Sequence, residues 1–139
     1  MRIAVAYASG SLGGFVTALF IWLLGDIGIT SAAGVAIAPA LTPAWLYSRA
    51  VWGGLWGFAF LLPFLAHRRW WVRALVFSLG PTLSTWLIIL PVQAEAGVFG
   101  FGLGLLTPVF VAVFNATWAL TTGASMAAVV KLHQQELAS

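Results

Sequence analysis

The feature of this sequence that most constrains its fold is a series of long apolar runs without a charged residue. These runs cover residues 3–25, 27–48, 50–66, 74–94 and 96–130. A helix needs about 20 consecutive apolar residues to cross the hydrocarbon core of a bilayer. The apolar positions do not alternate with polar ones, so helices are favoured over the strands of a membrane barrel. We therefore expect an all-α integral membrane protein.

Charged residues are too scarce for a soluble protein of this size. Only 6% of the 139 residues are charged, whereas soluble domains carry about 25%. A small soluble domain leaves much of its surface in water and could not hide a chain that is 62% hydrophobic. The formal charge of +3 comes from six scattered basic residues, which argues against a nucleic-acid partner. The expected partner is the lipid bilayer.

The apolar runs predict four transmembrane helices in a single domain, residues 1–139. We place them at residues 3–24, 43–66, 73–90 and 108–131, followed by a cytoplasmic tail, residues 132–139. Pro63 and Pro81 should kink or weaken the helices that contain them, because proline lacks the backbone N–H.

Two of these helices share a start signal. Thr42-Pro43 and Thr107-Pro108 each place a hydroxyl residue before a proline. A threonine can cap a helix N-terminus, and proline is tolerated in the first helical turn, where its missing N–H costs nothing. Both helices should therefore begin at these pairs.

Basic residues predict the orientation in the membrane, because they favour the cytoplasmic side. In a four-helix topology Arg49 alone falls on the outer side. We therefore expect both termini in the cytoplasm. The short connecting segments suggest a cell membrane of bacterial inner-membrane type. The basic residues that fall on the opposite side are Arg2, Arg68, Arg69, Arg73 and Lys131.

Two parts of the chain resemble each other. Residues 11–13 and 78–80 both read Ser-Leu-Gly, and residues 41–43 and 106–108 both read Leu-Thr-Pro. The similarity predicts two tandem helical hairpins, residues 3–66 and 73–131, related by a pseudo-two-fold axis along the membrane normal. The alternative is chance similarity between two hairpins of like composition. The glycine-rich linkers, residues 27–40 and 96–105, are either re-entrant segments or loops at the headgroups.

Glycines at four-residue spacing predict close helix packing. Gly10 and Gly14 form one GxxxG pair and Gly53 and Gly57 another, while Gly123 belongs to a stripe of small residues in the last helix. Such positions let backbones approach where lipid gives no hydrophobic drive. They serve packing within the chain, contacts between subunits, or both.

Arg49 is the most informative charged residue. It lies about 9 Å into its predicted helix, at 1.5 Å per residue. A charge at membrane depth is costly and is normally paired or faces a cavity. One hypothesis is an anion site in an outward-facing pocket. The other is structural: an ion pair with Asp26 or Glu95, or a side chain that reaches to the surface.

Asn115, Trp52 and Trp118 are further candidates for a ligand site near Arg49. Their alternative roles are a hydrogen bond between helices for Asn115 and simple packing for the tryptophans. Nothing near His67 or His133 supplies the carboxylates and further histidines that a metal site needs, and cysteine is absent, so we expect neither a metal site nor a cofactor.

The sequence suggests an oligomeric channel or transporter for an anion or small polar solute. The alternative is a non-catalytic accessory or lipid-interacting subunit of a larger membrane complex. A membrane enzyme is not expected, because no nucleophile constellation is recognisable.

Overall fold

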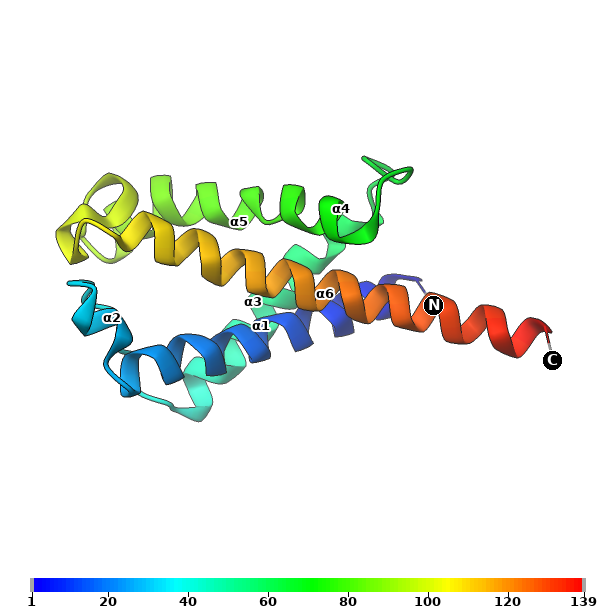
Figure 1. Ribbon diagram of the computed structural model, residues 1–139, viewed down its shortest axis with the longest axis horizontal. Coiled ribbons are helices and arrows are strands. Elements are labelled where there is room, and N and C mark those ends of the chain that lie inside the picture. The colour runs from blue at the N-terminus through cyan, green and yellow to red at the C-terminus, as the bar shows by residue number, and fades with distance from the viewer. Residues whose placement is uncertain (1, 139) are drawn as a thin grey trace.

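The computed structural model describes residues 2–138, and these residues form helices and connecting segments without a strand. The predicted all-α fold is confirmed. Three helical stretches are long and apolar enough to cross a membrane: Arg2–Asp26, Trp70–Gln93 and Thr107–Ala138. The helices in chain order are α1 (Arg2–Asp26), α2 (Ile29–Ala32), α3 (Pro43–Gly57), η1 (Phe58–Leu61), α4 (Trp70–Phe77), α5 (Leu79–Ser84), η2 (Thr85–Gln93), η3 (Val98–Leu103) and α6 (Thr107–Ala138) (Figure 1).

The second predicted helix is shorter than expected. It consists of α3 and a 3-10 turn, η1, and ends at Leu61 rather than at residue 66. Leu62 adopts an extended conformation, with φ −66° and ψ 138°. The residue before a proline is driven out of the helical region by the proline ring, so Pro63 accounts for this early end.

The third helix begins earlier than expected, at Trp70, and changes its winding along its length. A turn at Ser78 separates α4 from α5, and residues 85–93 form a π-helix, η2. At its end the N–H of Ala94 donates to the carbonyl of Ile89, five residues back. Pro91 lies inside η2 and cannot donate the N–H that an α-helix needs there, which favours the wider turn.

The two threonine start signals behave differently. Thr42 caps α3, because its hydroxyl accepts a hydrogen bond from the N–H of Trp45 at 3.2 Å. Thr107 is already the first residue of α6, and its buried hydroxyl has no hydrogen-bond partner. The predicted cap at Thr107 is therefore wrong, because the helix begins at this residue rather than after it.

The last helix also extends farther than expected. It continues through residues 132–138, which were predicted as a tail; Ser139 lies outside the described residues. At 1.5 Å per residue, its 32 residues span about 48 Å. Beyond residue 128 its side chains are exposed, and Figure 1 shows this end projecting past the other helices.

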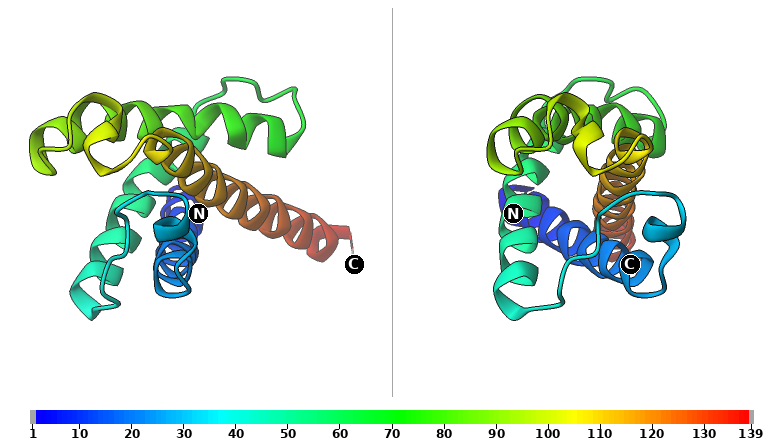
Figure 2. Two further views of the ribbon diagram at one scale, coloured as in Figure 1. Left: turned by 60° about the vertical axis from the view of Figure 1, so that its left-hand side comes forward. Right: turned by 90° about the vertical axis from the view of Figure 1, so that its left-hand side faces the viewer.

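The long helices lie side by side in the order α3, α1, α6, α4–η2. Helix α1 packs on α3 and α6, and α4 packs on α6, whereas the backbone of α3 stays apart from α5 and η2. The ring of Trp56 on α3 reaches across to Gly80 of α5. Seen along the bundle, α3 and α6 flank α1, and the segment α4–η2 lies across from it (Figure 2). The bundle is therefore left open between α3 and η2.

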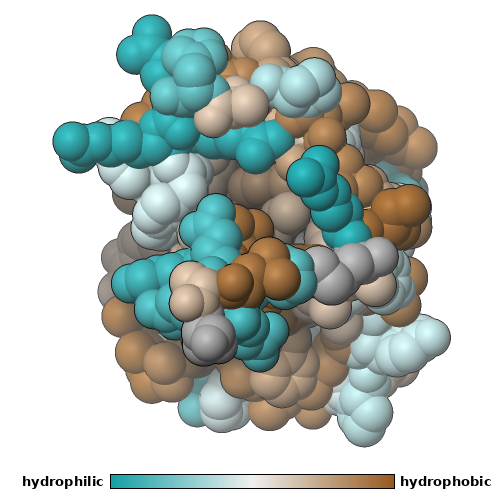
Figure 3. Space-filling model, turned by 90° about the vertical axis from the view of Figure 1, so that its right-hand side faces the viewer, coloured by the Kyte–Doolittle hydropathy of each residue, from teal (hydrophilic) through white to brown (hydrophobic). Residues whose placement is uncertain are grey.

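The two ends of the bundle differ in polarity. The start of α1, residues 62–69 and the end of α6 lie at one end, and α2 and η3 lie at the other (Figure 1). Figure 3 looks onto the first of these ends, where hydrophilic side chains gather over an otherwise apolar body. At the opposite end the linkers contact each other, and the N–H of Ala36 donates to Leu103 at 2.7 Å.

Glycines bring α1 and α3 into backbone contact. A methyl group on Gly53 would lie 2.8 Å from the Cα of Gly14, and one on Gly10 would lie 2.9 Å from the Cα of Gly57. Gly123 is less tightly enclosed, since the nearest atom to such a methyl is the Cβ of Ala74, at 3.1 Å. All five glycines thus face other helices of the same chain.

The two predicted hairpins differ in form. The first pairs a straight helix, α1, with the short α3, while the second pairs the broken segment α4–η2 with α6. The tandem repeat and the fourth span therefore stay predictions.

Candidate functional site

A cavity of about 510 Å³ lies where α1, α3, the segment α5–η2 and α6 meet. Gly14 and Thr17 of α1 contribute to its wall, together with Asn115 and Trp118 of α6. The wall on α3 is mostly aromatic, and the wall on α5–η2 mixes hydroxyl, amide and aliphatic side chains. Because α3 and η2 barely touch, the cavity is bounded by two walls that do not close on each other.

All four residues predicted to bind a ligand line this cavity. Arg49 and Trp52 come from α3, and Asn115 and Trp118 come from α6. These helices make little contact with each other; α1 lies between them, and its small residues allow both to approach. The structure therefore brings together residues that lie more than 60 positions apart in the sequence.

The guanidinium group of Arg49 has no hydrogen-bond or ion-pair partner among residues 2–138. Its central carbon lies 5.5 Å from the ring centroid of Trp45, one turn earlier on the same helix. The predicted ion pair with Asp26 or Glu95 is not formed among the described residues. Stacking on Trp45 holds Arg49 beside its own helix instead.

Asn115 is half-buried and makes no side-chain hydrogen bond to the described residues. The alternative role of an interhelical hydrogen bond is thus not seen. An amide offers two donors and an acceptor. In this position those groups are available to a molecule in the cavity.

The two predicted tryptophans have different roles. Trp118 is only 4% exposed, and its indole N–H donates to the carbonyl of Gly10 at 3.2 Å. It also packs edge-on against Phe60, with ring centroids 6.0 Å apart. Trp52 is 61% exposed and makes no such bond. Trp118 therefore builds the floor of the cavity, whereas Trp52 is free to contact a ligand.

The polar side chains that α1, α5 and η2 contribute were not among the predicted site residues. Ser84, Thr85 and Gln93 line the cavity, and the hydroxyl of Thr85 donates to Pro81 at 2.8 Å. Thr17 carries a buried hydroxyl without a partner. Pro81 and Pro91, which both lie in the apolar run 74–94, could have indicated these residues. Two prolines in one run indicate an irregular helix, in which polar residues can face inward.

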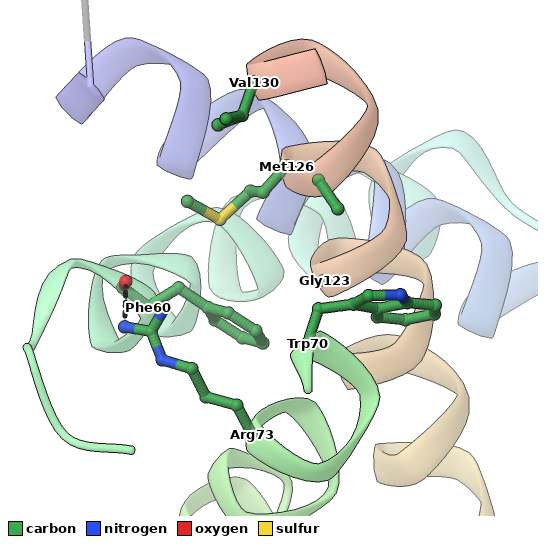
Figure 4. Close-up of a pocket in the computed structure, with 7 residues that line it drawn as sticks. Phe60, Trp70, Arg73, Gly123, Met126 and Val130 are labelled. Atoms are coloured by element: carbon green, nitrogen blue, oxygen red, sulfur yellow. Dashed lines mark hydrogen bonds between the residues drawn. The ribbon is translucent and has the colours of Figure 1, made fainter. Parts of the chain in front are cut away.

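A second arginine, Arg73, occupies a different environment. Its Nη2 donates to the carbonyls of Phe60, at 2.7 Å, and Leu62, and its Nε donates to Phe64 at 3.1 Å. Figure 4 shows this side chain turned toward the carbonyl of Phe60 beside a smaller pocket, of about 290 Å³. Arg73 thus satisfies the carbonyls that the end of η1 leaves free.

Residues 2–138 contain no group of three His, Cys, Asp or Glu side chains that could hold a metal ion. The fold and the site together define an all-helical chain with three helices able to cross a membrane and a cavity lined by an unpaired arginine. No family model, curated protein or solved structure matches this chain.

Proposed function

We propose that this protein is a small multi-pass membrane protein that binds and passes an anion or small polar solute, as a channel or transporter. The observation that carries the proposal is the free guanidinium of Arg49 on the wall of the 510 Å³ cavity. A charged side chain within a membrane-spanning bundle is costly without a partner and commonly marks an ion or substrate pathway. An anion in the cavity would supply the missing partner through charge-assisted hydrogen bonds.

The contrast with Arg73 strengthens this argument. Both arginines stack on an aromatic ring of their own helical segment. Arg73 also donates to backbone carbonyls at the end of η1, so its structural role is evident. Arg49 has no comparable contact, and its side chain is exposed, so its donors are accessible to a ligand in the cavity.

The proposal includes four membrane-spanning segments. The 15 residues of α3 extend about 22 Å and the four of η1 about 8 Å, which together approach the roughly 30 Å of a bilayer core. The basic residues then place both termini and residues 67–69 in the cytoplasm.

Single cysteines test this topology, because the chain has none of its own. Ser31→Cys should react with a membrane-impermeant maleimide from outside intact cells. His67→Cys and Gln134→Cys should react only after the membrane is opened. Labelling of Ser31→Cys and His67→Cys from the same side would rule out a span through α3.

We also propose that several copies assemble, since four thin helices enclose little space alone. Native mass spectrometry from detergent would detect the oligomer. A strict monomer that still transports would remove this part of the proposal.

Flux in reconstituted liposomes tests the function itself. We expect release of at least one member of a panel of small inorganic and organic anions and neutral polar solutes, and strong loss of that flux in Arg49→Gln. Arg68→Gln is the matched control, because Arg68 is exposed and lies outside the cavity. Absence of flux for every solute would favour the accessory-subunit hypothesis instead.

A further inference from the structure

We infer that the cavity at Arg49 binds an organic monoanion with an apolar body, such as an aryl or alkyl carboxylate, in preference to an inorganic anion. The inference rests on the proposed function in that it concerns the same site. It adds the chemical class of the ligand.

The charge of the cavity selects a single negative charge. Among residues 2–138, Arg49 is the one charged residue on the cavity wall, and the other polar groups there, such as Ser48, Gln93 and Asn115, are neutral. A dianion such as sulfate would be only half neutralised by one guanidinium, because the other polar groups on the wall carry no charge. A carboxylate matches the forked N–H groups of one guanidinium.

The residues around Arg49 select an apolar body. Trp45, Arg49, Trp52 and Trp56 recur at helical spacing, so they share one face of α3, and all four line the cavity. Aromatic faces bind apolar and aromatic groups, with most of the gain from buried area. The cation is therefore set within a row of indole rings.

The opposite wall, on α5 and η2, also combines apolar surface with a few neutral polar groups. Ile88 and Ile89 of η2 present aliphatic surface to the cavity, while Ser84 and Thr85 lie beside them. The hydroxyl of Thr85 is already engaged with Pro81. Ser84 and Gln93 keep free donors on this wall, but both are neutral, so an inorganic anion there would lie against aliphatic surface without a second positive charge.

The volume agrees with an organic ligand. A cavity of about 510 Å³ falls in the usual range for sites that hold small organic molecules. Chloride or nitrate would fill little of this space and would leave the indole and isoleucine surface in contact with water, whereas an apolar ligand body removes that surface from water. A single amphipathic anion both fills the cavity with its apolar body and neutralises Arg49 with its carboxylate.

Equilibrium binding to the purified full-length protein in nanodiscs tests the inference. The probes are 3-phenylpropanoate, its neutral primary amide, and chloride. Isothermal titration calorimetry measures the binding of each probe. We expect the carboxylate to bind and the amide to bind at least about tenfold more weakly, because the charge-assisted hydrogen bonds are lost. Chloride in excess over the carboxylate should not displace it beyond the effect of ionic strength, measured with sulfate, a dianion that the site should not bind.

Variants assign the binding to the cavity and correct for uptake by the lipid. Arg49→Gln should weaken carboxylate binding at least about tenfold, and Arg68→Gln should leave it unchanged. Trp52→Leu, at an exposed position that packs no core, should weaken the carboxylate and the amide alike. Thermal unfolding without ligand confirms that each variant is folded.

The inference is overturned if the carboxylate does not bind, if the amide binds equally well, or if chloride competes at matched ionic strength. Undiminished binding to folded Arg49→Gln would overturn it as well. Carboxylate binding at Arg49 without flux of any solute would remove the transport function and leave the ligand class standing. Chloride flux without carboxylate binding would leave the transport function standing and remove the ligand class.

Discussion

The contact between α1 and α3 makes Gly53→Ala the most direct test of this fold. A methyl group at residue 53 would lie 2.8 Å from the Cα of Gly14 and still closer to the carbonyl oxygen of Gly10. Optimal carbon contacts are about 3.5 Å or longer, so the helices would have to separate by roughly 0.7 Å. All of the opposing atoms belong to the backbone, and no side chain can rotate away.

The expected cost is about 1–3 kcal/mol, the usual range for overpacking a tight interface. Alanine also favours a helix over glycine by about 1 kcal/mol, and this gain offsets part of the cost. Gly123→Ala is the matched control. It gains the same helix propensity, while the nearest atom to its methyl is a side-chain carbon of Ala74 at 3.1 Å. We therefore expect Gly53→Ala to be less stable than Gly123→Ala.

Unfolding in mixed micelles with increasing SDS measures this difference, with helical circular dichroism as the signal. The double variant Gly10→Ala/Gly53→Ala should lose less than the sum of the single losses, because the first methyl already separates the helices. If Gly53→Ala is as stable as Gly123→Ala, the backbone contact between α1 and α3 does not exist as described. A fall in oligomer size without loss of monomer stability would assign the glycines to a subunit contact.

Further predictions use the same unfolding measurement. Arg73→Gln should lose about 2 kcal/mol, because the carbonyls at the end of η1 lose a charged donor. Arg49→Gln should lose less than about 1 kcal/mol, because only stacking on an indole ring is lost; an equal loss in both would make Arg49 structural. Thr42→Ala should cost about 1 kcal/mol through loss of the cap. Thr107→Val should be neutral or stabilising, because it removes a buried hydroxyl without a partner; a large loss there would reveal a hydrogen bond at this hydroxyl.

Much of the fold follows from the charge-free runs alone. Their length and lack of alternation predict helices, and α1, α4–η2 and α6 lie where three of the runs lie. The ends of helices are less predictable, because they depend on a few atoms. Pro63 ends the second helix through its own ring, whereas the start of α6 depends on the turn in which the N–H of Thr107 bonds to Gly104. No propensity at Thr107 encodes that turn.

The candidate site is predictable in part for a similar reason. Arg49 and Asn115 are conspicuous as polar residues in apolar helices, so the sequence identifies them without any contact information. Thr17 and Thr85 are not conspicuous, since a threonine can satisfy its hydroxyl on its own helix. Whether such a residue faces a cavity depends on how helices rotate against each other. In this protein that rotation follows from the glycine contacts and the π-helix.

The two arginines show what sequence reasoning cannot separate. Both lie near the start of an apolar helix, and both follow or precede an aromatic residue by four positions. Arg73 becomes structural only because the chain breaks before Pro63 and exposes carbonyls to it, an event about ten residues away. Arg49 lies inside the α-helix α3, where each backbone carbonyl accepts from the N–H four residues on, so the helix offers it no free carbonyl. Under the proposed function, an anion in the cavity supplies the partner that the chain itself does not provide to Arg49.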